Sequence, residues 1–145
     1  MKKITQKQKQ ERGVKGESLL TDSLRPAGLW NHKLVNAGYG TLFDKIIIPP
    51  GGGYAVEVKT RMVPRIEYSK IERNERKGLD RFMEKVGPKH AYILGIWLTE
   101  DTKRAFLIPW YQVRDAVCSG CRGSIKMLDF PELPRQGSGW DMSCF

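Results

Sequence analysis

The stretch Ala55-Val56-Glu57-Val58-Lys59-Thr60 is an apolar run that contains one acid and one base. In a β-strand alternate side chains share a face, so Glu57 and Lys59 should project together, away from the valines beside them. Such a pair has two interpretations, a solvated charged face or a chemical site.

A second strand-like run at residues 42–48 contains Asp44, and the turn-forming segment 49–53 (Pro-Pro-Gly-Gly-Gly) separates the two runs. An Asp and a Glu on paired strands, with a Lys two residues further on, would form an oxygen-lined pocket beside a cation. That combination suits metal-assisted hydrolysis of a phosphodiester. The sequence therefore favours a chemical site.

The hairpin must bring Asp44 to the same face as Glu57, because directly opposed residues share a face. A five-residue loop at 49–53 would instead pair Asp44 with Val58. The sequence thus predicts a loop of four or six residues, or a bulge in one strand, and the glycines make either accessible.

Mg²⁺ prefers oxygen ligands, usually one or two carboxylates completed by water and phosphate oxygens. We expect Asp44 and Glu57 to supply the carboxylates and the Val58 carbonyl to be a further ligand, with Mn²⁺ as a substitute for Mg²⁺. Three roles are open to Lys59: orienting the attacking water, helping to deprotonate it, or stabilising developing charge.

The chain has 145 residues, enough for one domain with a hydrophobic core. Its longest apolar run, residues 91–98, is far shorter than the roughly 20 residues that cross a bilayer, and no signal peptide is recognisable. We expect a cytoplasmic protein with no membrane partner. Cys118 and Cys121 have the spacing of half a zinc site, but with only Cys144 beyond them we favour reduced thiols.

The formal charge is +9 and the pI is near 9.6. Beside a carboxylate site, this excess of positive charge favours DNA as the partner. The residues expected to contact DNA are Lys2, Lys3, Lys7, Lys9, Lys15, Lys33 and Arg61.

We expect a basic N-terminal arm at 1–12, a domain at 13–118 and a C-terminal extension at 119–145 that is mostly loop. The expected elements are a helix at 16–24, strands at 29–35, 42–48 and 54–60, a helix at 69–86, strands at 91–98 and 104–108, a helix at 110–117 and one late strand near 125–128. Helices on both sides of a mixed central sheet make this an α/β domain.

Glu17 shares a helical face with Leu20 and Leu24, at the end of the stripe that should pack on the sheet. An acid there belongs either to a metal site or to the first helical turn, where the helix dipole favours it.

Together, Gly16-Glu17, Asp44 and Glu57-Val58-Lys59 resemble the PD-(D/E)xK nuclease superfamily. More narrowly, residues 13–109 look like the Holliday junction resolvases of the archaeal Hjc and bacterial RecU type, including their phage relatives. The spacing of Gly78, Phe82 and Gly87 also matches those proteins. The resemblance implies a restriction-endonuclease-like αβββαβ core with a mixed central sheet flanked by helices.

The resemblance also implies that Asp44 and Glu57 bind Mg²⁺, that Glu17 completes or supports the metal site, and that Lys59 is the catalytic lysine. The sequence departs from the pattern at two places. Phe43 replaces the proline of the superfamily's name, and Glu75, beside Asn74, takes a helix position where such resolvases often have a glutamine.

The function implied is that of a Mg²⁺-dependent endonuclease that cuts branched DNA, above all four-way junctions, as a homodimer, because two symmetric nicks need two sites. Two alternatives are a nuclease of the same fold acting on duplex DNA or DNA ends, and a non-catalytic DNA-binding module. The presence of Asp44, Glu57 and Lys59 argues against the last.

Overall fold

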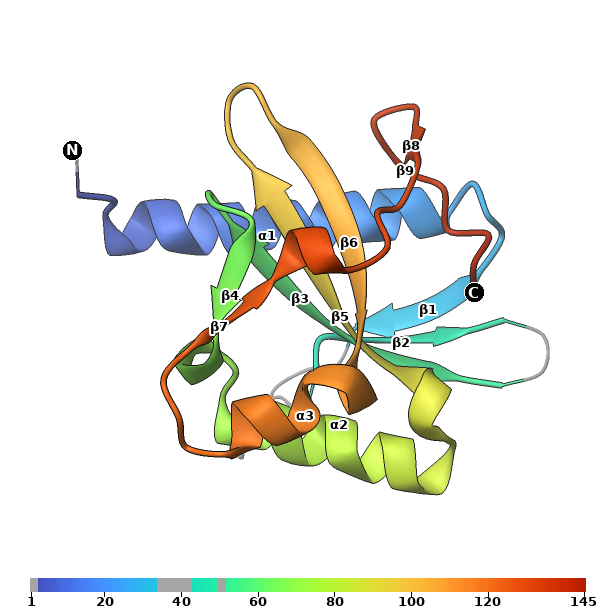
Figure 1. Cartoon of the computed structure of the whole chain (residues 1–145). Helices are drawn as coiled ribbons and strands as arrows, with labels where there is room; N and C mark the ends of the chain where they lie inside the picture. Colours follow the sequence, from blue (N-terminus) through green and yellow to red (C-terminus); the bar gives the residue numbers. More distant parts are fainter. Residues whose placement is uncertain (1–2, 34–42, 50–51) are drawn as a thin grey trace.

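The structure is a computed structural model that describes residues 3–33, 43–49 and 52–145 (Figure 1). Five strands form a mixed sheet in the order β1-β2-β3-β5-β6, in which only the β3–β5 pair is parallel. This confirms the predicted α/β fold, a mixed central sheet flanked by helices. The elements are α1 (Gln6–Leu24), β1 (Trp30–Lys33), β2 (Lys45–Ile48), β3 (Tyr54–Arg61), β4 (Arg65–Glu67), α2 (Arg73–Lys85), β5 (Ala91–Leu98), β6 (Lys103–Pro109), α3 (Trp110–Cys118), β7 (Ser124–Lys126), β8 (Arg135–Gln136) and β9 (Gly139–Trp140), with 3₁₀ turns at Tyr68–Lys70, Pro88–His90 and Met127–Asp129.

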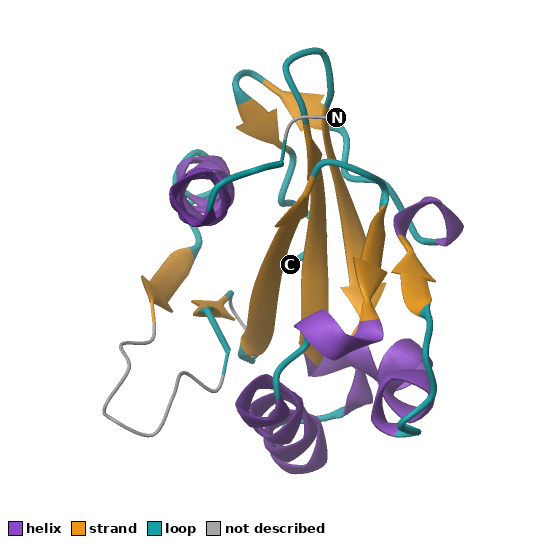
Figure 2. Ribbon diagram, turned by 90° about the vertical axis from the view of Figure 1, so that its left-hand side faces the viewer, coloured by secondary structure: helices purple, strands orange, loops and turns teal. Residues whose placement is uncertain are grey.

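Each face of the sheet has its own hydrophobic core, one beneath α1 and the other beneath α2 and α3 (Figure 2). Because side chains alternate along β3, Val56 and Val58 belong to the α1 core, whereas Ala55 belongs to the α2 core. Glu57 and Lys59 have the same parity as Ala55. They therefore face α2, as the alternation predicted.

The pairing of β2 with β3 decides which residue lies opposite Asp44. The ladder ends on the pair Ile47–Tyr54, so six residues (48–53) separate the paired positions. One step beyond the opposite end of the ladder, Asp44 comes opposite Glu57. The six-residue connection is one of the predicted solutions and is confirmed.

Helix α1 starts at Gln6, so the predicted start at Gly16 is wrong. Its start is set by a capping box, in which the side chains of Thr5 and Gln8 each accept the other's backbone N–H. The Lys, Gln, Glu and Arg residues that follow are good helix formers, but they lack the apolar periodicity on which the prediction relied. The buried residues of α1 begin only at Gly16, so the basic N-terminal half extends past the sheet as an exposed helix (Figure 1).

The segment 119–145 packs onto both cores. Residues Ile125 and Met127 lie in the α2 core, and Trp140 lies in the α1 core, where its backbone N–H donates to Ser23 Oγ at 3.0 Å. The late strand expected near 125–128 is present as β7, whereas β4, β8 and β9 were not predicted. The division of the chain at residue 118 stays a prediction.

Gly16 allows α1 to approach β3 closely. A Cβ built at Gly16 would overlap with Thr60 Oγ1, whereas one at Gly13 meets nothing within 4 Å. Because Gly16 precedes Glu17, this close approach also determines how near Glu17 comes to the sheet.

We predict that Gly16→Ala lowers the free energy of unfolding by about 1–3 kcal/mol, because Thr60 or the whole helix must shift. Gly13→Ala is the matched control in the same helix, and it should raise the free energy of unfolding by about 0.5–1 kcal/mol through helix propensity alone. Denaturant titration followed by circular dichroism measures both changes. Equal effects of the two substitutions would contradict the close approach.

Candidate functional site

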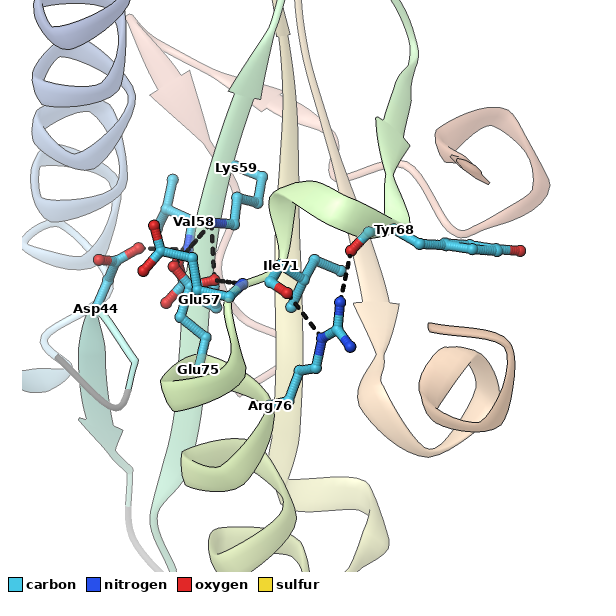
Figure 3. A network of polar contacts seen from close by, with 9 residues as sticks. Asp44, Glu57, Val58, Lys59, Tyr68, Ile71, Glu75 and Arg76 are labelled. Atoms are coloured by element: carbon cyan, nitrogen blue, oxygen red, sulfur yellow. Dashed lines mark hydrogen bonds and ion pairs between the residues drawn. The ribbon is translucent and has the colours of Figure 1, made fainter. Parts of the chain in front are cut away.

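Glu57 and Lys59 form a buried ion pair on β3 (Figure 3). Lys59 Nζ lies 3.2 Å from Glu57 Oε1, and the Glu57 side chain is only 4% exposed. Removing two charges from water costs several kcal/mol per ion unless they are well paired. The interpretation of this pair as a solvated charged face is therefore wrong.

Asp44 lies just before β2 and binds the backbone of the neighbouring strand. Its Oδ2 accepts the Val58 N–H at 2.7 Å, at the residue between Glu57 and Lys59. Burial raises the pKa of Asp44 to about 6, although the hydrogen bond from Val58 opposes the shift. The charge of Glu17 adds to the rise.

The neighbouring groups are also strongly perturbed. Burial, followed by the charges of Asp44 and Glu75, raises the pKa of Glu57 well above its usual range. Burial alone would lower the pKa of Lys59, but the charges of Glu57 and Glu75 outweigh it and the pKa is raised. Glu57 and Glu75 thus flank the Lys59 ammonium group, and Asp44 and Glu75 both act on Glu57. The mutual repulsion of these three acids would be relieved by a bound divalent cation.

Glu75 comes from the first turn of α2. Its two carboxylate oxygens lie 2.9 Å (Oε1) and 2.8 Å (Oε2) from Lys59 Nζ. The sequence marked this position only as a departure from a glutamine, with no role assigned. The signal that could have identified it is the pair of acids at 72 and 75, which form a capping box and so place Glu75 at the start of the helix.

Glu17 lies on the α1 side of the sheet, whereas Glu57 faces α2. It forms an ion pair with Lys33 at 2.7 Å and lines a cavity of about 190 Å³. The cavity is also lined by Val14, Ser18, Thr21, Asp22, Lys33, Asp44, Lys45 and Val58. Asp44 borders this cavity and also binds the strand that carries Lys59, so it connects Glu17 with the buried cluster.

Within the ranges that the structure describes, no three His, Cys, Asp or Glu side chains gather as a complete set of metal ligands. Asp44, Glu57 and Glu17 therefore do not form a three-carboxylate site by themselves. Mg²⁺ usually takes only one or two carboxylates and keeps several waters. The donors Asp44, Glu57 and the Val58 carbonyl fit such a hard cation, with Glu17 in a supporting position beside Lys33.

The residues predicted to contact DNA are spread over three elements. Lys7, Lys9 and Lys15 are exposed on α1, Lys3 is exposed just before it, and Lys2 lies outside the described residues. Lys33 on β1 pairs with Glu17, and Arg61 at the end of β3 pairs with Glu67. Lys33 and Arg61 are thus held by close ion pairs, whereas Lys7 on α1 has only a 4.0 Å contact with Glu11. Contact of all these residues with DNA stays a prediction.

Two further expectations concern features outside the cluster. Cys118, Cys121 and Cys144 are free thiols at the surface. Across the described part of the chain, no helix is both long and apolar enough to cross a membrane.

No family model matches the chain, and no curated protein matches it in sequence. Among solved structures, it is similar to Hjc, a Holliday junction resolvase from the archaeal hyperthermophile Archaeoglobus fulgidus, with a TM-score of 0.58 and 21% identity over 82% of this chain and 92% of that chain. This chain has the fold of Hjc. A bacterial homing endonuclease, I-Ssp6803I, aligns with a TM-score of 0.48 and 13% identity over 93% of this chain and 79% of that chain. The restriction-endonuclease-like fold that the sequence resemblance implied is confirmed.

We predict that the metal-free protein loses stability as the pH rises from about 4 through about 6. The pKa of Asp44 is about 6 in the folded protein, above its usual 3.8, so the folded state binds more protons in this interval and the free energy of unfolding falls with pH. The loss should be about 2 kcal/mol. Glu57, whose pKa is also raised, adds to the decline.

Chemical denaturation in EDTA across this pH range measures the effect. Asp44→Asn is the control, because its amide oxygen can still accept the Val58 N–H while the titrating group is gone. The decline should be smaller in the variant. The same decline in both proteins would show that another group is responsible.

Proposed function

We propose that this protein is a metal-dependent endodeoxyribonuclease that cuts branched DNA, above all four-way Holliday junctions, as a homodimer in the cytoplasm. The observation that carries the proposal is the buried set of Asp44, Glu57 and Lys59 around the Val58 backbone. Such a charged cluster lowers the stability of a strand that could have been apolar, and clusters of this kind are concentrated at functional sites. The shared fold with an Hjc resolvase supports a nuclease.

Hydrolysis of a phosphodiester forms a bond between the water oxygen and phosphorus and breaks one P–O ester bond, which leaves a phosphate monoester and a free hydroxyl. In the proposed site Asp44, Glu57 and the Val58 carbonyl hold Mg²⁺ or Mn²⁺, which when bound neutralises phosphate charge and activates water. Glu17 supports this set from the α1 side.

Lys59 has a specific part in the proposal. Because its pKa is raised, its amine is protonated at neutral pH and cannot take a proton from water. It is instead suited to stabilise the negative charge that develops on the phosphate and leaving-group oxygens. Of the three roles open from the sequence, this is the one that its surroundings favour.

The test is to incubate the purified protein with a labelled four-way junction and a matched linear duplex, in Mg²⁺ or in EDTA. We predict paired, symmetric nicks in the junction with Mg²⁺, none in EDTA, and a loss of about 10²–10³-fold in kcat for Lys59→Ala. Lys89→Ala removes an exposed lysine beyond the far end of α2 and should cut like the wild type. Circular dichroism of both variants shows whether they are folded.

The outcomes separate the alternatives. Equal cutting of junction and duplex would keep the site but make the protein a nuclease for duplex DNA or DNA ends. Tight binding without cutting would leave a DNA-binding module and overturn the catalytic proposal. A monomer by analytical ultracentrifugation, both free and with junction, would contradict the homodimer.

We also predict that the exposed lysines of α1 bind DNA phosphates. The double variant Lys9→Ala/Lys15→Ala should bind the junction more weakly and should reduce the slope of log Kd against log salt concentration by about 1–2, because each phosphate contact releases a counterion. Fluorescence anisotropy over a series of salt concentrations measures this slope, with Lys89→Ala as a control that removes one exposed lysine outside α1. A slope equal to that of the wild type would mean that DNA does not reach α1.

A further inference from the structure

We propose that Glu75 is a positioning residue that holds the ammonium group of Lys59 beside Glu57, and that its position requires a carboxylate rather than an amide. The inference rests on the proposed function, because it assigns Glu75 to the same nuclease site.

Two donors from different elements converge on Glu75. Lys59 Nζ, from β3, donates to Oε1 at 2.9 Å, and the backbone N–H of Glu72, at the start of α2, donates to Oε2 at 3.0 Å. A carboxylate accepts on both oxygens, whereas an amide has one acceptor and one donor group. Lys59 Nζ also lies 2.8 Å from Oε2, so a glutamine in this place would turn its NH₂ towards the ammonium group in either orientation.

The start of α2 is a fixed support for this contact (Figure 3). The Glu72 side chain accepts the backbone N–H of Glu75, which completes the capping box. Arg76 donates from Nε to the Ile71 carbonyl at 2.7 Å and from Nη2 to the Tyr68 carbonyl at 3.0 Å. The first turn of α2 is thus tied to the segment that precedes it. Glu75 therefore keeps its position when the Lys59 side chain moves.

Burial makes the pair stronger than one at the surface. The side chains of Glu75 and Lys59 are 12% and 17% exposed, so solvent and salt screen them little. If Glu57 were its only partner, the Lys59 ammonium group would remain paired with a carboxylate that is also a proposed metal ligand. A second carboxylate on the helix draws the ammonium towards α2 and keeps Glu57 available.

The first test does not depend on activity. In metal-free protein, acetylation of Lys59 by acetic anhydride is followed by mass spectrometry, with the exposed Lys89 as the internal reference. In Glu75→Ala the rate at Lys59 should rise at least about fivefold, the upper end of what the loss of an exposed ion pair gives. Glu72→Ala removes the reciprocal cap but keeps the Glu75 carboxylate, so it should leave the rate unchanged. An unchanged rate in Glu75→Ala, or an equal rise in Glu72→Ala, overturns the proposal.

The second test is a double-mutant cycle on junction cleavage. Glu75→Ala should lower kcat about 10- to 100-fold with the Kd for the junction unchanged. Because Glu75 acts through Lys59, adding Glu75→Ala to Lys59→Ala should cause no further loss. Additive losses would mean that Glu75 acts elsewhere and would overturn the proposal.

Two variants separate positioning from capping. Glu75→Gln should recover only part of the lost kcat, because its NH₂ would face the Lys59 ammonium group and its amide carries no charge. Glu72→Ala should keep most of the wild-type rate. Full activity in Glu75→Gln would refute the requirement for a carboxylate. If the wild type cut no DNA, the proposed function would fail, while the acetylation of Lys59 would still decide whether Glu75 holds it.

Discussion

The structure depends on keeping a buried cluster of charges neutralised inside a sheet. Glu57 and Lys59 lie on β3, with a strand on each side and a helix over each face, where water screens them little. Leaving one such charge without its partner costs about 3–5 kcal/mol, a large fraction of the stability of a domain of this size. The loop before β2 supplies Asp44, and α2 supplies Glu75. Because the charges come from three separate segments of the chain, the packing of the fold and the arrangement of the site constrain each other.

Hydrophobic patterns within single segments predicted the helices and strands that position the site. The strands that were not predicted are fixed by contacts between residues far apart in the sequence. The strand at 91–98 has the predicted bounds because eight consecutive residues that suit an interior strand leave little ambiguity. Strands β4, β8 and β9 have only two or three residues, too few to show an alternation. Their place is fixed by contacts such as that between Trp140 and Ser23, which no local pattern reveals.

The same distinction holds within the site. Asp44, Glu57 and Lys59 could be brought together from the sequence, because strand parity and a short hairpin are nearly geometric rules. Glu75 could not be added to this set from the sequence, because its contact with Lys59 depends on where α2 crosses β3. Glu17 was correctly placed on the side of α1 that approaches the sheet, but its partner Lys33 comes from β1 and could not be predicted from a helical face alone.

The site brings acids to both faces of the sheet. The close approach at Gly16 keeps Glu17 near Asp44 on the α1 side, and the capped start of α2 keeps Glu75 on Lys59 on the other. Acids outnumber bases in this cluster, so by itself it would repel a phosphate, although the chain as a whole has a charge of +9. The two charges act over different ranges: the exposed lysines attract a polyanion from a distance, whereas the final approach of a phosphate requires the local negative charge to be offset. For a nuclease this separation means that attraction of DNA depends on the surface, and cutting depends on what neutralises Asp44 and Glu57.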